Sequence, residues 1–258
     1  MPSLRILSYN VNGIRAASKK GWYEWLNLDQ PDIVCVQETK AQPDQLSEAE
    51  RQPDGYHAYF HSAEKKGYSG VAIFSKVKPN HVEIGCGIDF IDQEGRVIRA
   101  DYDGFSVISL YAPSGSSGEH RQDIKEEFMK VWPAYVQELR KTHPRLLICG
   151  DYNIAHTKID IHDPVGNKKS SGFLPHEREW FTDLLALGYV DTFRQWHPDA
   201  IHQYSWWSHR ANARANNKGW RIDYHLVTAE LADAVTGARI LPDVMHSDHC
   251  PIEVSLQI

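Results

Sequence analysis

The chain has few cysteines and lacks any long apolar stretch. Its four cysteines are scattered without the C-x-x-C spacing of zinc or redox motifs, and Cys35 and Cys149 lie inside apolar runs, which is typical of buried thiols. No stretch approaches the length of a membrane span, and the N-terminus has no apolar signal-peptide region. There is no Asn-x-Ser/Thr acceptor for glycosylation either. We therefore expect a protein of a reducing compartment, the cytosol.

Internal repeats, interdomain linkers and nucleotide-binding loops are also missing. Residues 114–118 and 166–170 are rich in small side chains, but neither segment has the G-x-x-x-x-G-K-[ST] spacing that cradles nucleotide phosphates. At 258 residues, with 41% hydrophobic and 24% charged residues, the chain can form one large core. We predict a single domain over residues 1–258.

The composition lacks the positive charge that nucleic-acid binders need for phosphate contacts, since the formal net charge is -6. The distribution of charge is more informative than the sum. Residues 205–225 contain four basic side chains against one acid, Asp223, so this stretch carries about +3. Two lysine pairs, at residues 65–66 and 168–169, are ordinary solvated surface when taken singly.

Nine short apolar runs are typical of β-strands: residues 5–9, 33–36, 56–60, 70–74, 97–102, 105–111, 146–149, 224–227 and 252–256. Helical spacing predicts helices over residues 22–28, 124–139, 180–187 and 231–235, the last two closed by Gly188 and Gly237. Pro133 should kink or divide the second helix. Asp103-Gly104 should turn a hairpin. So many strands favour two packed mixed sheets with helices outside over one open sheet.

Polar side chains repeatedly stand where the predicted strands begin or end. In extended chain, residues i and i+2 face the same side, so Asp151 and Asn153 can address one ligand, as can Asn10 and Asn12. A single Asp or Asn at a strand end is often only a turn former. Buried carboxylates gathered from several strands repel one another, however, and need a cation to stay ionised. The set comprises Asn10, Glu38, Asp151, Asn153, Asp223, Asp248 and His249.

A metal ion is therefore expected at this edge of the sheets. The oxygen-rich donor set favours Mg²⁺, with Mn²⁺ as a substitute, over zinc. His246 and His249 have the H-x-x-H spacing of some zinc sites. No third nitrogen or sulfur ligand stands at a familiar spacing, however, and the segment leads into a strand.

Six motifs occur in order along nearly the whole chain: SYNVNGIR at residues 8–15, QETK at 37–40, YSGVA at 68–72, GDYNIAH at 150–156, GWRIDY at 219–224 and SDHCP at 247–251. Together they resemble the exonuclease III family of apurinic/apyrimidinic (AP) endonucleases, within the endonuclease/exonuclease/phosphatase superfamily. The resemblance implies an α/β fold, a four-layer α/β sandwich of two packed mixed β-sheets flanked by helices.

The resemblance also implies a function. The family cleaves double-stranded DNA 5′ to abasic sites with Mg²⁺ in base excision repair, and has 3′-phosphodiesterase and 3′–5′ exonuclease activity. We expect a monomer that acts on duplex DNA with abasic sites or blocked 3′ ends. The missing N-terminal extension is typical of a bacterial enzyme of the cytosol.

The resemblance assigns roles that an in-line attack on a phosphodiester requires. Glu38 and Asp248 would hold the metal ion, supported by Asn10. Asp151 and Asn153 would position and activate the attacking water beside the metal. His249, oriented by Asp223, would contact the scissile phosphate, with Tyr111 as a second contact. The residues expected around the metal are Asn10, Glu38, Asp151, Asn153, Asp248 and His249.

Aromatic and basic residues alternate in residues 205–225, which suits a surface for a nucleic-acid strand. By resemblance, Trp206, Trp220 and Ile222 would line the abasic pocket, although core packing is the alternative for any single Trp. Arg210 is the basic residue of this stretch that we expect to bind DNA. Relatives often carry an amide where this chain has Ser114 or Ser170, so Asn167 is the preferred phosphate contact.

Two other functions share part of this pattern. A phosphoinositide or sphingomyelin phosphodiesterase of the same superfamily would use the same metal cluster. The basic, tryptophan-containing stretch and the lack of a membrane-binding extension argue against it. A non-catalytic DNA-binding member would have lost Glu38, Asp151 or His249, and all three are present.

Overall fold

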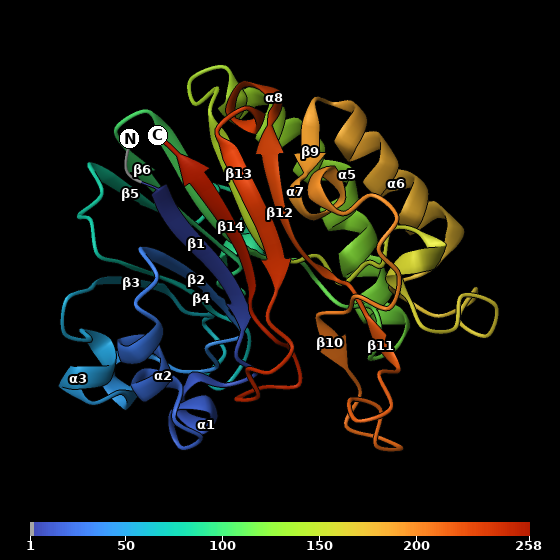
Figure 1. The fold of residues 1–258 in the computed structure, drawn as a ribbon, viewed down its shortest axis with the longest axis horizontal. Coiled ribbons are helices and arrows are strands. Elements are labelled where there is room, and N and C mark those ends of the chain that lie inside the picture. The colour runs from blue at the N-terminus through green and yellow to red at the C-terminus, as the bar shows by residue number, and fades with distance from the viewer. Residues whose placement is uncertain (1–2) are drawn as a thin grey trace.

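The computed structural model describes residues 3–258 and contains two six-stranded β-sheets packed face to face (Figure 1). The first sheet has the strand order β13-β14-β1-β2-β4-β3, and the second has the order β5-β6-β7-β8-β12-β9. Both sheets are mixed, because β1 is parallel to β2 and β7 is parallel to β8, whereas the other neighbours are antiparallel. The predicted fold class is therefore confirmed.

The strands of the first sheet are β1 (Ser3–Asn10), β2 (Ile33–Gln37), β3 (His57–His61), β4 (Val71–Ser75), β13 (Val235–Ile240) and β14 (Ile252–Gln257). Those of the second are β5 (His81–Ile84), β6 (Val97–Tyr102), β7 (Phe105–Tyr111), β8 (Leu146–Asp151), β9 (Tyr189–Asp191) and β12 (Asp223–Thr228). A separate two-stranded ribbon consists of β10 (Trp206–Trp207) and β11 (Gly219–Trp220).

The helices are α1 (Ile14–Ser18), α2 (Trp22–Asp29), α3 (Glu48–Arg51), α4 (Asp89–Asp92), α5 (Glu119–Arg140), α6 (Pro175–Ala186), α7 (Thr192–Trp196) and α8 (Ala229–Ala232). Two 3₁₀ helices cover Pro43–Gln45 and Lys158–Asp160. Within residues 3–258, no helix combines the length and apolar character needed to cross a membrane.

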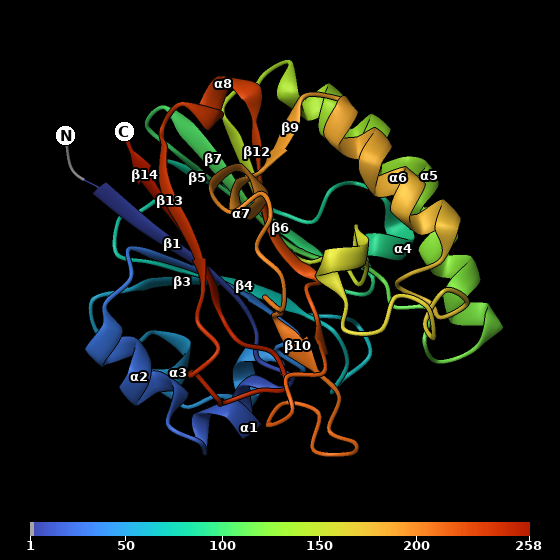
Figure 2. The same ribbon diagram turned by 45° about the vertical axis from the view of Figure 1, so that its right-hand side comes forward.

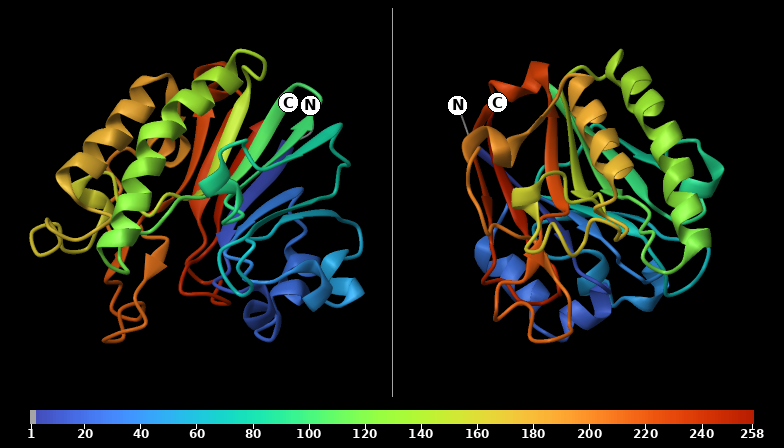
Figure 3. Two further views of the ribbon diagram at one scale, coloured as in Figure 1. Left: turned by 180° about the vertical axis from the view of Figure 1, so that it is seen from behind. Right: turned by 90° about the vertical axis from the view of Figure 1, so that its right-hand side faces the viewer.

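Three apolar clusters hold the sheets and helices together, and Figure 2 shows the two sheets lying between the helices. Between the sheets, Cys35 of β2 and Val107 of β7 belong to one buried cluster. On the outer face of the first sheet, Val34 packs in a cluster with Trp22 of α2. Helices α5 and α6 lie side by side on the outer face of the second sheet, where Trp132 is fully buried (Figure 3). Because both faces of the central strands are covered, these strands are predominantly apolar and do not alternate strictly between apolar and polar residues.

All nine predicted strands are present within two residues at each end, and Asp103-Gly104 turns the predicted hairpin between β6 and β7. The strands that the sequence did not predict are short or lie at edges. Strand β5 is largely exposed, β9 has three residues, and β10 and β11 have two each. Such strands bury too little surface to produce an apolar run.

One helix prediction is wrong. Residues 231–235 form only the end of the short helix α8 and the start of strand β13, and Gly237 lies at a bulge in that strand instead of closing a helix. Of the two outcomes expected at Pro133, a kink or a division, the division does not occur, because helix α5 runs through this proline as one element. An internal proline costs roughly 3 kcal/mol. The burial of Trp132 and Val136 beside it offsets that cost, because helical stability in proteins comes mostly from packing.

Strand direction brings the polar strand ends to one rim of the sandwich. The carboxyl ends of β1 and β8 meet there, since Asn10 Nδ2 donates to Asp151 Oδ2 across the two sheets at 3.0 Å. Strand β14 is antiparallel to β1, and β12 is antiparallel to β8, so their amino ends lie at the same rim. The β10–β11 ribbon borders this rim, because Trp206 forms a β-bridge with His249.

Candidate active site

Several rim residues have an unusual backbone conformation. Glu38, directly after β2, and Asn153, two residues after β8, both have a φ of 53°. Positive φ is uncommon for residues with a Cβ, and such strain concentrates at functional sites. The backbone N–H of Asn153 donates to Asp151 Oδ1 at 2.8 Å. Oδ1 of Asp151 therefore stabilises the turn, whereas its Oδ2 accepts from Asn10 and belongs to the polar cluster.

Asn10 and Lys40 organise the first carboxylate of the cluster. Asn10 Nδ2 donates to Glu38 Oε1 at 2.9 Å as well as to Asp151, and Lys40 Nζ lies 2.6 Å from Glu38 Oε2. Burial acts to raise the pKa of Glu38, but the Lys40 ammonium and the Asn10 amide hold it below its usual value. Glu38 is therefore ionised at neutral pH.

His249 lies between two carboxylates on neighbouring strands. Asp151 and Asp223 are cross-strand partners, and His249 pairs through Nδ1 with Asp223 Oδ2 at 2.9 Å and through Nε2 with Asp151 Oδ2 at 3.8 Å. Burial acts to lower the pKa of His249, but the charge and hydrogen bond of Asp223 raise it to about 10. Ser205 Oγ donates to the same Asp223 oxygen at 2.6 Å. The imidazole is thus a fixed imidazolium at neutral pH.

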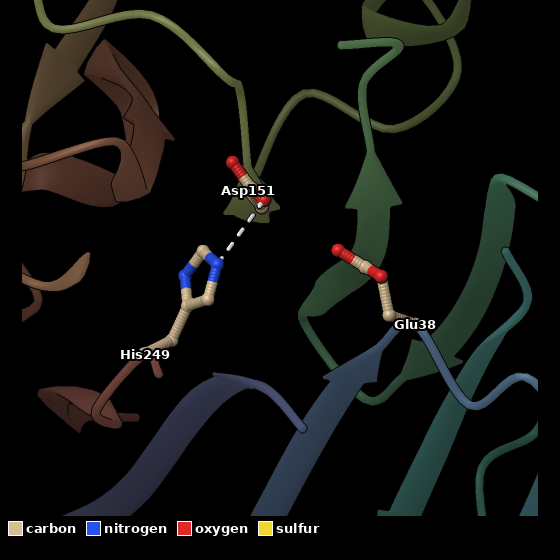
Figure 4. Close-up of side chains that lie close together, drawn as sticks. All are labelled: Glu38, Asp151 and His249. Atoms are coloured by element: carbon tan, nitrogen blue, oxygen red, sulfur yellow. Dashed lines mark ion pairs between the residues drawn. The ribbon is translucent and has the colours of Figure 1, made fainter. Parts of the chain in front are cut away.

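The acid cluster fits a divalent cation. Glu38, Asp151 and His249 offer ligand atoms that all lie within 4.8 Å of one another (Figure 4). Burial, reinforced by the Asp223 carboxylate, raises the pKa of Asp151 to about 8. Without a cation this acid therefore keeps its proton at neutral pH, as expected of a carboxylate built to face a metal ion. Since an imidazolium donates instead of ligating, the donors in this cluster are the hard carboxylate oxygens of Glu38 and Asp151.

Asp248 lies beside this cluster with partners of its own. Its Oδ1 accepts from Asn12 Nδ2 at 2.9 Å, and its Oδ2 accepts from Trp206 Nε1 at 3.1 Å. Burial acts to raise the pKa of Asp248, but the positive charge of His249 and these two donors hold it below its usual value. Asp248 is thus a second ionised acid at the rim, outside the tight group of Glu38, Asp151 and His249.

Tyr111 ends β7 and supplies a protonated hydroxyl to the site. Burial and the nearby Glu38 carboxylate raise the pKa of Tyr111 well above its usual value, so it remains a hydrogen-bond donor. Its ring packs on the Arg96 guanidinium, whose carbon is 4.7 Å from the ring centre, and its carbonyl accepts from Arg96 Nη1 at 2.8 Å.

A pocket of about 600 Å³ opens above these groups. Asn10 and Asp223 do not line the pocket themselves. Asn10 hydrogen-bonds to Glu38, and Asp223 to His249, and these two partners do line it. Arg210 is exposed on the loop between β10 and β11 and does not line the pocket. The predicted residues that do line it are Glu38, Tyr111, Asp151, Asn153, Asn167, Trp206, Trp220, Ile222, Asp248 and His249.

The tryptophans form one wall of this pocket. The rings of Trp206 and Trp220 meet edge to face with centres 6.0 Å apart, and both rings are only partly buried. Ile222 packs beneath them with Phe173. The two tryptophans therefore pack against a small buried cluster and also line the pocket. Ser114 and Ser170, which we expected less than Asn167 to contact a ligand, also line the pocket.

Some residues of the site were not predicted. The sequence assigns no role to Lys40, two residues after Glu38, and it predicts a charge of about +3 for residues 205–225 without showing which of these basic side chains are buried. In the structure Arg221 is buried, with Nε 2.7 Å from Asp160 Oδ1 and Nη2 2.7 Å from Asp191 Oδ2. Less of the estimated +3 is thus available to a ligand than the sequence indicated.

The fold and the site define a class of protein, an α/β-sandwich hydrolase. The Endonuclease/Exonuclease/phosphatase family model matches residues 7–251, and the chain belongs to this family. An exodeoxyribonuclease of Bacillus subtilis is 43% identical over 99% of this chain and 100% of its own length. The DNA repair nuclease APEX1 of Danio rerio is 40% identical over 99% of this chain and 83% of its own length. The solved structure of an AP endonuclease from Archaeoglobus fulgidus has a TM-score of 0.89 at 32% identity, covering 99% of this chain and 100% of that one.

Proposed function

We propose that this protein is a Mg²⁺-dependent DNA repair phosphodiesterase, an AP endonuclease that cleaves double-stranded DNA 5′ to abasic sites. The observation that carries the proposal is the pocket of about 600 Å³, which combines an acidic floor with a wall of Trp206, Trp220 and Ile222. With a cation bound, the floor would suit a phosphodiester, and the aromatic wall suits an extruded sugar without a base. The names of the relatives, exodeoxyribonuclease and DNA repair nuclease, agree with this function.

Asp151 and Asn153 are the proposed water-handling pair. Asn153 Nδ2 donates to the carbonyl of Ala112 at 2.9 Å, which leaves its side-chain oxygen for the pocket. Asp151 Oδ2 faces the same space and accepts the proton of the attacking water as general base. Glu38, Asp151 and Asp248, with Asn10 in support, are the residues that would hold the cation. When bound, a divalent cation would neutralise charge on the phosphate and on the departing oxygen.

His249 and Tyr111 are the proposed phosphate donors. The imidazolium of His249 is held by Asp223 and presents Nε2 toward the pocket. The Tyr111 hydroxyl, at the end of β7, is the second donor, and Tyr111 lines the same pocket. Donors aimed at the developing negative charge stabilise the transition state more than the ground state. Asn167, on the loop that borders the pocket, is the proposed contact to a flanking phosphate.

The same chemistry at a strand end would give 3′-phosphodiesterase and 3′–5′ exonuclease activity, in keeping with the name of the Bacillus subtilis relative. The remaining predictions belong to this proposal as well. They are a single domain over residues 1–258, a monomer, action in the cytosol in base excision repair, and Arg210 as a DNA contact.

The test is incision of a duplex that carries one abasic analogue. With Mg²⁺, the parent protein should cut 5′ to the lesion, and EDTA should abolish the cut. Glu38→Gln and Asp151→Asn should each lower the rate by roughly a thousandfold or more, because each removes a charge from the reacting centre. Asp54→Asn, an exposed acid far from the rim in sequence, is the matched control and should cut at the parent rate. Hydrolysis of sphingomyelin or phosphoinositides, with the abasic duplex left intact, would contradict the proposal.

A further inference from the structure

Arg214 lies in the basic stretch, but its guanidinium is already committed. It donates through Nη1 to the carbonyls of Ser247 at 2.7 Å and His249 at 3.3 Å, and through Nη2 to those of Pro242 and Val244, both at 2.8 Å. A guanidinium has five N–H donors. Four hydrogen bonds to one short segment therefore leave Arg214 little capacity to bind a phosphate.

The segment that Arg214 holds carries two site residues, Asp248 and His249. Residues 241–249 connect β13 to β14 without a helix or strand of their own. Ladder hydrogen bonds therefore do not fix their conformation. Main-chain hydrogen bonds to the ribbon exist at the end of the segment, from Trp207 N to Asp248 O at 3.1 Å and from Cys250 N to Ser205 O at 2.8 Å. The stretch before them is held by Arg214 and by a further hydrogen bond, from His246 N to Tyr9 Oη at 3.1 Å.

Arg214 is itself held in place from the other side. Its guanidinium carbon lies 4.6 Å from the centre of the Trp207 ring, and Trp207 Nε1 donates to Asn217 Oδ1 at 3.1 Å. A planar guanidinium stacked on an indole face has few rotamers left to lose. The guanidinium of Arg214 is thus held rigidly by the ribbon while it donates to carbonyls of residues 242–249.

Two other residues that line the active-site pocket, Tyr111 and Asn153, also have a main-chain carbonyl bound by a cationic side chain. Arg96 Nη1 donates to the carbonyl of Tyr111 at 2.8 Å, and Lys125 Nζ donates to the carbonyl of Asn153 at 2.9 Å. Both side chains are 1% exposed. In each case a cation from outside the pocket holds the main chain of a residue that faces it.

We propose that Arg214 is a positioning residue, which fixes the backbone of residues 247–249 so that Asp248 and His249 face the reacting phosphate. It acts through these two residues and does not contact DNA. The inference rests on the proposed function, because it assigns Arg214 a part in the same incision reaction.

The test compares Arg214→Ala with Arg210→Ala, two truncations on the same ribbon loop, on the abasic duplex. Because a displacement of about 1 Å at a reacting group costs roughly a hundredfold in rate, Arg214→Ala should lower the single-turnover rate at saturating DNA by roughly 30-fold to 100-fold. Its DNA affinity in EDTA and the slope of that affinity against salt should match the parent. Arg210→Ala should instead weaken DNA affinity and reduce its salt slope by about 0.9.

Chemical rescue separates positioning from a general loss of structure. Arg214 borders an open pocket of about 550 Å³ that a small cation can enter. Guanidinium at roughly 20 mM, far below denaturing concentrations, should restore the Arg214→Ala rate severalfold and saturably, and should not affect Arg210→Ala. If Arg214→Ala does not fold, the rate and the salt slope are measured on Arg214→Lys, which keeps the charge but offers one nitrogen. It should lose about tenfold in rate with the parent slope.

A parent-like rate for the Arg214 variant, a salt slope reduced by about 0.9, or a folded Arg214→Ala that guanidinium does not rescue would overturn the inference. Failure of the parent itself to cut the abasic duplex would instead overturn the proposed function. The two failures are therefore distinguishable within one experiment.

Discussion

At the scale of single residues, the charge of His249 depends on Asp223. The 2.9 Å pair between them keeps the pKa of His249 at about 10, although burial alone would push it below its usual value. His249 is therefore positively charged up to about pH 10. It loses this charge as the pH rises through that value.

The substitution Asp223→Asn should accordingly shift the alkaline limit of activity. Without the carboxylate, the pKa of His249 should fall to about 6.5 or lower, so that the rate at pH 8 drops by roughly a hundredfold. The measurement is the single-turnover incision rate between pH 6 and pH 10.5. Ser205→Ala, which removes one hydrogen bond to Asp223 but not its charge, is the control and should keep the parent limit within about one pH unit. An unchanged alkaline limit in Asp223→Asn would show that His249 does not donate as an imidazolium.

The raised pKa of Asp151 makes metal binding dependent on pH. Because this pKa is about 8, a proton occupies Asp151 below pH 8 and competes with the cation. The dissociation constant for Mg²⁺ should therefore increase up to about tenfold for each pH unit below 8 and should level off above it. Isothermal titration calorimetry of the DNA-free protein checks this. Asp151→Asn should bind more weakly with little dependence on pH, and a parent affinity that is constant from pH 6 to pH 8 would refute the prediction.

The position of a candidate residue at the rim could be predicted where the signal is local. Asn10, Glu38 and Asp151 follow long apolar runs, so their place at a rim could be read from the order of residues. Lys125 and Arg214 could not be predicted in this way, because the carbonyls that they bind lie 28 and 33 positions away in the chain. A sequence shows that an arginine is present but not whether it faces solvent or a carbonyl.

At the scale of elements, Gly150 lets β8 approach β7 directly behind the site. It has a φ of +146°, and a Cβ at this position would lie 1.8 Å from the carbonyl oxygen of Leu110. Strand β7 ends at Tyr111 and strand β8 ends at Asp151, and these two residues are register partners. A side chain here would therefore separate the two strands where both enter the site.

The substitution Gly150→Ala should lower the free energy of unfolding by roughly 3 kcal/mol or more, through backbone strain and overpacking together. Chemical denaturation measures the change. Gly237→Ala is the matched control within a strand, because a Cβ there meets no atom within 4 Å, and it should stay within about 0.5 kcal/mol of the parent. Equal stabilities of the two variants would refute the close approach of β7 and β8.

The elements most readily predicted from the sequence are the strands that are buried on both faces. The central strands, such as β2 with all five residues buried, form apolar runs that stand out from their surroundings. The edge strand β13 alternates only in part and contains Gly237, so the local sequence predicts the end of a helix where this strand begins. Its pairing with β14, which depends on residues far along the chain, overrode the local pattern.

At the scale of the whole molecule, the net charge of -6 and the acidic rim work against binding of DNA, which is itself an anion. A bound cation and the imidazolium of His249 offset that repulsion locally. Under the proposed function, specificity for damaged DNA depends on the pocket wall, since only a nucleotide that leaves the duplex easily would reach Trp206 and Trp220.

The most direct test of this claim is the ratio of two rates. Single-turnover incision is measured with Mg²⁺ on a duplex that carries one abasic analogue and on the same duplex with an intact nucleotide at that position. A difference of a few kcal/mol in extruding the nucleotide predicts a rate at least about a hundredfold higher for the abasic duplex, with one cut 5′ to the lesion that leaves a 3′-hydroxyl. Equal rates on the two duplexes, or a cut elsewhere, would contradict it.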